Sequence, residues 1–379
     1  MNKASGRRIG VLAFSSCTNY GGMLQVYALQ EAIARIGHIP EVVDLWPIPN
    51  NKYLLGVLKN PNVGIGSRLK GLRQWLFDRA YRLNERRYGS FRLWQGRNMR
   101  MTGRHWRTAR EFAENPPELD LLEVGSDQVF NRNVSRLFLC TDVPESLARV
   151  SYGASFGSLD GTDEERRRLI AGLSKFKGLS ARENSGVAFI REILGKDVPW
   201  VVDPVLLHDA GFWRKAAWRE QDGREPYAFL YWLGPVGGIK DRIRDLQAQT
   251  GLKVKLFTGG YYKGFPMDME GVDVQWGADP FDFVSAVGNA QCVASNSFHA
   301  MMFSLLFEKK AFFVTSETAD RKASSTRFSD IAAIARCEGA LHREWSGGKM
   351  DFFDLSGCIG NCRGMIDRSL GTLEALCAL

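Results

Sequence analysis

Short apolar segments that end in polar residues, or are followed directly by them, recur along the first half of this chain, separated by helical patterns. The segments are Arg8–Phe14, Leu121–Val124, Arg149–Ser155, Gly178–Arg182 and Trp200–Asp203. Near-continuous apolar runs of this length are typical of parallel strands covered by helices on both faces. Ligands of open parallel sheets bind outside the carboxyl ends of the strands. The sequence therefore predicts an α/β sheet whose polar groups gather along one edge.

A second series of strands and helices begins at Tyr227–Leu233, after a polar stretch that starts at His208. A chain of 379 residues is also too long for one compact core. We therefore predict two Rossmann-like lobes of parallel sheet, residues 1–207 and 208–379, that face each other across a cleft.

Positive charge is concentrated in one segment of the chain. Residues 66–110 contain thirteen lysines and arginines against Asp78 and Glu85, whereas the whole chain carries a net charge of +8. The spacing of apolar and cationic residues predicts a basic helical insertion over about residues 52–110 of the first lobe. Three interpretations remain open: a solvated insertion, a surface for an anionic glycan or for lipid headgroups, and a nucleic-acid surface. No nucleic-acid motif accompanies the charge, so we predict no nucleic-acid partner.

The sequence lacks membrane-spanning, export and metal-binding patterns. No apolar run reaches the roughly 20 residues that span a bilayer, and the N-terminus has no signal-peptide core. Seven scattered cysteines are typical of reduced thiols. We therefore predict a cytoplasmic protein, with the inner face of the membrane as its location if the basic segment meets lipid. The five histidines lie far apart in the sequence, so we expect no metal.

The stretch 293–304 places one histidine, His299, where a polar Ser-Asn-Ser turn becomes an apolar helix. The N–H groups and the dipole at a helix start suit an anion, and an imidazole exchanges protons near neutral pH. Taken alone, the stretch slightly favours a histidine that caps an ordinary helix. The polar ends of the other strands shift the preference towards a functional site.

Six motifs resemble, in order and spacing, those of the polysaccharide pyruvyl transferase family. They are Asn-Tyr-Gly-Gly-Met-Leu-Gln (19–25), Gly-Ser-Asp-Gln-Val-Phe-Asn (125–131), Ser-Tyr-Gly-Ala-Ser-Phe-Gly (151–157), Ser-Ala-Arg-Glu (180–183), Val-Asp-Pro (202–204) and Ser-Asn-Ser-Phe-His (295–299). Each motif alone is weak, but the six together are fairly specific. The resemblance implies a fold similar to GT-B glycosyltransferases, with two Rossmann-like lobes and the site between them.

The resemblance also implies a reaction, the transfer of a pyruvyl group from phosphoenolpyruvate to sugar hydroxyls of a cell-surface polysaccharide or its precursor. The product is a pyruvate ketal, and no cofactor is implied beyond the donor substrate. We expect the first lobe to bind the acceptor, a glycan or a lipid-linked oligosaccharide, and the second lobe to bind phosphoenolpyruvate. Peripheral contact with a membrane fits such an acceptor. Two other functions remain open: a GT-B-like glycosyltransferase that uses a nucleotide sugar, and a non-catalytic glycan-assembly protein.

Phosphoenolpyruvate carries a carboxylate and a phosphate, which arginine binds in bidentate fashion. Arg182 lies at a strand end, matches the family's arginine, and is our first donor-binding candidate. The alternative for Arg182 is a surface ion pair with Glu183 or Asp203. We interpret Asp203, which precedes a proline, as the end of a strand.

Better-characterised members of the family tend to carry Arg-Leu-His where this chain has Ser-Phe-His at residues 297–299. Ser297 therefore joins the donor-binding candidates without supplying a positive charge. The cations must come from elsewhere, and Arg321, Lys322 and Arg327 are the further candidates. They lie in the Ser- and Thr-rich segment 319–328, which we predict to be a loop that either closes over the phosphate or is simply solvated.

The remaining candidates would move protons or line the acceptor side. His299 is the candidate acid or base, or a donor-binding group. Asp127 is the alternative base for the acceptor hydroxyl, or else a cap for the following turn. Asn19, Tyr20 and Gln128 are predicted to contact the acceptor, with loop stabilisation as the alternative for Asn19.

Overall fold

The computed structural model describes most of the chain. The described residues are 6–45, 64–106, 108–131, 136–157, 159, 161–219, 225–234, 238–260, 268–315, 319–345 and 350–379, and for 109, 136 and 319–325 the backbone alone is described. Residues 52–63 of the predicted basic insertion lie outside these ranges.

The first lobe is built on a six-stranded parallel sheet. Its strands are β1 Arg8–Leu12, β2 Ile39–Leu45, β3 Met101–Trp106, β4 Leu121–Val124, β5 Arg149–Ala154 and β6 Gly178–Ala181. Their order across the sheet is β3-β2-β1-β4-β5-β6, and every neighbouring pair is parallel. This is the order of a Rossmann fold, whose direction reverses between β1 and β4.

The second lobe repeats this topology. Its strands are β7 Tyr227–Trp232, β8 Lys253–Thr258, β9 Val272–Val274, β10 Cys292–Ser295, β11 Lys310–Val314, β12 Leu341–His342 and β13 Phe353–Asp354. The order β12-β11-β10-β7-β8-β9 is again that of a Rossmann fold, and only β13 joins antiparallel, on β11. The predicted architecture of two Rossmann-like parallel-sheet lobes is therefore confirmed.

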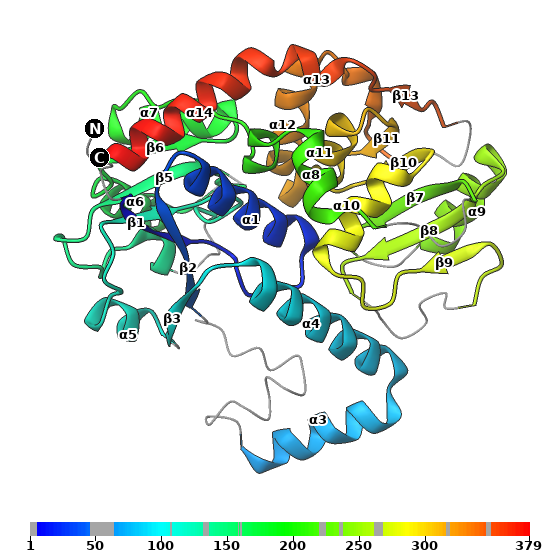
Figure 1. The fold of residues 1–379 in the computed structure, drawn as a ribbon, viewed down its shortest axis with the longest axis horizontal. Helices are drawn as coiled ribbons and strands as arrows, with labels where there is room; N and C mark the ends of the chain where they lie inside the picture. Colours follow the sequence, from blue (N-terminus) through cyan, green and yellow to red (C-terminus); the bar gives the residue numbers. More distant parts are fainter. Residues whose placement is uncertain are drawn as a thin grey trace.

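Helices cover the faces of both sheets (Figure 1). The helices associated with the first sheet are α1 Tyr20–Arg35, α3 Ile65–Phe77, α4 Arg79–Asn98, α5 Ala109–Glu114, α6 Asp163–Leu173 and α7 Asn184–Leu194. The remaining helices are α8 Ala210–Ala217, α9 Ile239–Thr250, α10 Pro280–Asn289, α11 Phe298–Leu306, α12 Ala319–Ala335, α13 Cys358–Asn361 and α14 Arg363–Ala378. No helix in the described part of the chain is long and apolar enough to cross a membrane.

Three local predictions were wrong. The segment 319–328 is helical, as the first part of α12, because its serines and threonines are not accompanied by a glycine or proline that would break a helix. The basic region 52–110 is not entirely helical, since β3 forms the edge of the first sheet. Trp200–Asp203 forms only a bridge to Ala181, because Pro204 supplies no N–H and starts a 3₁₀ turn.

The two lobes meet through an aromatic cluster. Tyr20, the first residue of α1, stacks on Phe283 of α10 with ring centroids 4.9 Å apart. Phe91 of the first lobe and Tyr231 and Phe257 of the second lobe also contact the Tyr20 ring. This contact fixes the N-terminus of α1 against the second lobe.

The last helix, α14, returns to the first lobe and runs along the top of both lobes in Figure 1. The Ser369 hydroxyl accepts a hydrogen bond from Val202 N at 3.0 Å, and Arg7 donates to the Cys377 carbonyl at 2.9 Å. The predicted division at residues 207 and 208 therefore assigns to the second lobe a helix that packs on the first.

Candidate active site

Four of the predicted site residues converge where the carboxyl edge of the first sheet meets the second lobe. Asp127 follows β4 and Arg182 follows β6, whereas His299 lies on α11 and Arg327 on α12. Asp127 and Arg182 lie on the same side of the first sheet because parallel strands end at one edge. Helices of the second lobe bring His299 and Arg327 to this edge, and the order of the elements along the chain does not predict that.

A buried ion pair lies at the centre of this site. Arg182 Nη1 donates to Asp203 Oδ2 at 2.5 Å, and both side chains are almost fully buried. Asp203 Oδ1 accepts from the backbone N–H of Val205 at 3.0 Å, so both carboxylate oxygens have a partner. Burial alone would raise the pKa of Asp203, but His299 and Arg182 lower it well below its ordinary value. Asp203 is therefore an ionised anchor for Arg182.

His299 is held between the lobes. Its Nε2 lies 3.5 Å from Asp203 Oδ2, and this contact does not have hydrogen-bond geometry. On its other side the ring rests against Gly21 in the first turn of α1. A Cβ at Gly21 would lie only 2.0 Å from His299 Nδ1, so this approach requires glycine.

Asp127 is the more accessible carboxylate of the site, with 18 % of its side chain exposed. Its backbone adopts a left-handed conformation with φ of 66°. Its Oδ1 accepts from Gln128 N at 2.9 Å and lies 3.5 Å from Arg182 Nη2. Burial would raise the pKa of Asp127, but Arg182, His299 and Arg327 together lower it below its ordinary value. The carboxylate is thus ionised at neutral pH.

Arg182 and Arg327 both pack over the ring of Phe298. The guanidinium of Arg182 lies 5.1 Å from the centroid of its ring, and that of Arg327 lies 5.3 Å from it. Arg327 is buried, and burial followed by the charge of Arg182 lowers its pKa to about 10. Both arginines therefore remain charged at neutral pH. They supply the positive charge that Ser297 does not.

The other predicted donor residues are placed differently. Ser297 caps α11, and its hydroxyl accepts from Ala300 N at 3.5 Å. Arg321 and Lys322 belong to α12, but their side chains lie outside the described part of the structure. Of the cations predicted in segment 319–328, the structure thus brings Arg327 to the site and leaves the other two side chains undescribed.

The acceptor-side candidates mainly support the fold around the site. Asn19 caps α1 by accepting from Gly22 N at 3.2 Å. Asn131 Nδ2 donates to the Gln128 side chain at 3.3 Å. Tyr20 is 1 % exposed, and its hydroxyl donates to the Ala278 carbonyl at 3.3 Å. Because Tyr20 is sealed in the aromatic cluster, it presents no surface to an acceptor in this arrangement.

Sequence reasoning gave three residues of the site no functional role. Asp203 was interpreted as a strand end, yet it anchors Arg182, and this ion pair is buried rather than on the surface. Phe298 is the shared platform of the arginines. Glu183 is buried, accepts from Phe156 N at 3.0 Å, and has its pKa raised by burial. The position of Asp203 in Val-Asp-Pro, beside an arginine on a neighbouring strand, was the available signal.

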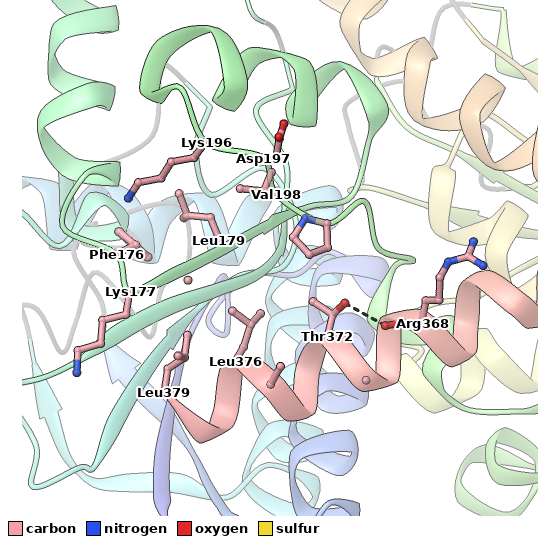
Figure 2. Close-up of a pocket in the computed structure, with 14 residues that line it drawn as sticks. Phe176, Lys177, Leu179, Lys196, Asp197, Val198, Arg368, Thr372, Leu376 and Leu379 are labelled. Atoms are coloured by element: carbon pink, nitrogen blue, oxygen red, sulfur yellow. Dashed lines mark hydrogen bonds between the residues drawn. The ribbon is translucent and has the colours of Figure 1, made fainter.

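A separate groove lies between the edge strand β6 and α14 (Figure 2). It has a volume of about 750 Å³, an apolar floor that includes Leu179 and Leu376, and Lys177, Lys196 and Arg368 among its lining residues. No predicted site residue lines this groove. Within the described ranges, His, Cys, Asp and Glu side chains form no group of three that could hold a metal ion.

The fold and the site define a two-lobed α/β protein with a charged site between its lobes. A family model described as polysaccharide pyruvyl transferase matches residues 19–318, and the chain belongs to that family. This match covers most of the chain and includes Asp127, Arg182, Asp203 and His299, whereas Arg327 lies beyond it.

Solved structures with similar architecture share little sequence with this chain. UGT89C1 of Arabidopsis thaliana, complexed with UDP-L-rhamnose, is 12% identical with a TM-score of 0.47, and the match covers 98% of this chain and 94% of that one. An alpha-glucosyltransferase in complex with UDP is 10% identical with a TM-score of 0.47, at coverages of 98% and 95%. UDP-GlcNAc 2-epimerase from Methanocaldococcus jannaschii is 9% identical with a TM-score of 0.46, at coverages of 95% and 92%. A search of curated protein sequences finds no match.

Proposed function

We propose that this protein transfers a pyruvyl group from phosphoenolpyruvate to two hydroxyls of a sugar, forming a ketal on a cell-surface polysaccharide or its precursor. The observation that carries the proposal is the pairing of Arg182 and Arg327 on Phe298, beside His299 and Asp127, in a chain of this family. The donor is phosphoenolpyruvate and no further cofactor takes part. The acceptor is a glycan or a lipid-linked oligosaccharide.

Arg182 and Arg327 bind the carboxylate and the phosphate of the donor in this proposal. Guanidinium groups bind both anions through paired N–H donors, and a partly buried setting strengthens the interaction. Asp203 holds Arg182 in position through Nη1, and Arg182 Nε has no hydrogen-bond partner among the described residues, so it is a donor left for the ligand. The 3.5 Å contact between Arg182 and Asp127 is long enough to yield to a donor anion.

The reaction has three steps. His299 gives a proton to C3 of the enol, a sugar hydroxyl attacks C2, and Asp127 accepts the hydroxyl proton. The C2–O bond to phosphate then breaks, and the leaving phosphate takes the proton from Asp127. A second hydroxyl closes the ketal at C2 and returns its proton to His299. The products are the ketal and one inorganic phosphate.

The test is incubation of the purified protein with phosphoenolpyruvate and sugar acceptors extracted from its source organism. We expect acceptor-dependent release of phosphate, and mass spectrometry should find the pyruvyl ketal on the acceptor. The same acceptors are incubated in parallel with nucleotide sugars. Glycosyl transfer without use of phosphoenolpyruvate would replace this proposal with a glycosyltransferase, and the absence of both reactions with the native acceptor would support a non-catalytic role.

A further inference from the structure

Helix α3 carries an apolar stripe that faces outward. Ile65, Leu69, Leu72 and Leu76 are 77%, 61%, 42% and 52% exposed. Their spacing of four, three and four residues places them on one face of the helix. Large apolar side chains that cluster on a surface mark an interaction site, whereas scattered ones do not.

Aromatic and cationic residues flank this stripe. Trp75 and Phe77, at the end of α3, are also exposed. Arg68, Lys70 and Arg73 lie within the helix, which contains no aspartate or glutamate. A helix with an apolar stripe, an aromatic residue and basic flanks is typical of segments that lie in the interface of an anionic bilayer.

The position of α3 leaves this stripe accessible. Gly71 is the buried residue of the helix, and among the described elements α4 makes the main contact with α3. Arg82 of α4 donates to the carbonyls of Trp75 and Leu76 at 3.1 and 2.9 Å, which ties the end of α3 to α4. Figure 1 shows α3 at the outer end of α4, away from both sheets.

We propose that α3 docks this protein on an anionic lipid bilayer. The stripe of Ile65, Leu69, Leu72 and Leu76 enters the boundary between headgroups and acyl chains, and the cations beside it meet headgroup phosphates. A second copy of the chain is the less suitable occupant, because two α3 faces would bring like charges together without a carboxylate to balance them. The proposal does not depend on the reaction proposed above.

The full-length protein is tested by co-sedimentation with vesicles of phosphatidylglycerol or of phosphatidylcholine. We expect binding to the anionic vesicles that weakens as salt is raised, because headgroup attraction is screened beyond about 8 Å at physiological ionic strength. Leu69→Glu should weaken binding by roughly tenfold or more, since it removes apolar contact and adds repulsion. Lys70→Gln and Arg73→Gln, which keep the stripe, should each weaken binding about fivefold.

Leu93→Glu is the matched control, because Leu93 is 63% exposed on α4 but lies outside the stripe, and Leu69 is 61% exposed. Leu93→Glu should bind anionic vesicles like the unmodified protein, and circular dichroism should show that all variants fold. Equal binding by Leu69→Glu and Leu93→Glu would overturn the proposal, as would equal binding to neutral vesicles. A dimer in light scattering that Leu69→Glu abolishes would overturn it in favour of a second copy.

Discussion

Arg182 and Arg327 come from different lobes, yet both guanidinium groups lie over the ring of Phe298, 5.1 and 5.3 Å from its centroid. Two buried like charges at one ring are stable only with negative charge nearby. Asp203 supplies it on one side, and Asp127 lies within 3.5 Å of Arg182 on the other. An incoming dianion would meet both arginines at once.

Arg327→Gln should weaken phosphoenolpyruvate binding roughly 10- to 100-fold, because a hydrogen bond to a charged group contributes about 1.5–3 kcal/mol. Calorimetric titration with phosphoenolpyruvate measures this change. Arg191→Gln is the control, since Arg191 is an exposed arginine of α7 that pairs with Asp197 at the surface. Unchanged affinity in Arg327→Gln would remove this residue from the donor site.

His299→Ala should lower the rate of phosphate release by about 10²–10⁴-fold, the usual effect of removing a proton-transfer group. His105→Ala serves as control, because His105 is a partly exposed residue of β3 that contacts Asp44. If His299→Ala keeps full activity while the pyruvyl product still forms, the proton donor is a different residue.

Gly21→Ala should reduce activity while leaving the protein folded. The new Cβ would lie 2.0 Å from His299 Nδ1, so the ring or the start of α1 must move. Gly96→Ala in α4 is the matched control, because nothing lies within 4 Å of a Cβ there and alanine favours a helix by about 0.5–1 kcal/mol. Thermal melting and steady-state rates of the two variants distinguish the outcomes: equal rates would contradict a close contact between Gly21 and His299.

Asp203→Asn should destabilise the protein by about 3–5 kcal/mol, because it leaves the buried charge of Arg182 without its partner. Urea unfolding at neutral pH measures the loss. The double variant Arg182→Met with Asp203→Leu should recover most of it, since it removes both charges. A double variant as unstable as Asp203→Asn would show that the ion pair itself is not the cause.

The same carboxylate predicts a pH dependence. The folded pKa of Asp203 lies below its ordinary value of 3.8, so its stabilising contribution is fully present above that pH. The contribution is lost as the pH falls from 3.8 towards the lower folded value. Asp203→Asn should therefore lose less stability than the unmodified protein on acidification below about pH 4.

Glu123→Gln should stabilise the protein at pH 8 more than at pH 5. Glu123 is buried on β4 and accepts from Tyr152 N at 2.8 Å, and burial raises its pKa from 4.5 to about 8. Between these values the unfolded chain ionises while the folded chain stays protonated, so stability falls as the pH rises, by up to about 4 kcal/mol. Glutamine keeps an acceptor for Tyr152 without this titration. If the unfolding free energies of Glu123→Gln and of the unmodified protein change with pH in parallel, the pKa of Glu123 is not raised.

Much of the fold could be predicted because its signals are local. The apolar segments at Leu121–Val124 and Tyr227–Leu233 needed only their own composition to be read as buried strands. Helix α7 likewise ends at a local signal, because Gly195 after it adopts the left-handed conformation that closes a helix. Segment 319–328 was misread because serine and threonine occur in loops and in helices alike, and the segment contains no glycine or proline that would break a helix.

Local composition specifies which chemical groups stand at the ends of the strands, and it was enough to identify Asp127, Arg182 and His299 as candidates. Which of these groups touch depends on tertiary packing. Asp203 was found to bind Arg182, Phe298 to carry two arginines, and Tyr20 to be sealed between the lobes. These contacts join residues up to about 260 positions apart, and they depend on packing within and between the two lobes, which no local pattern encodes.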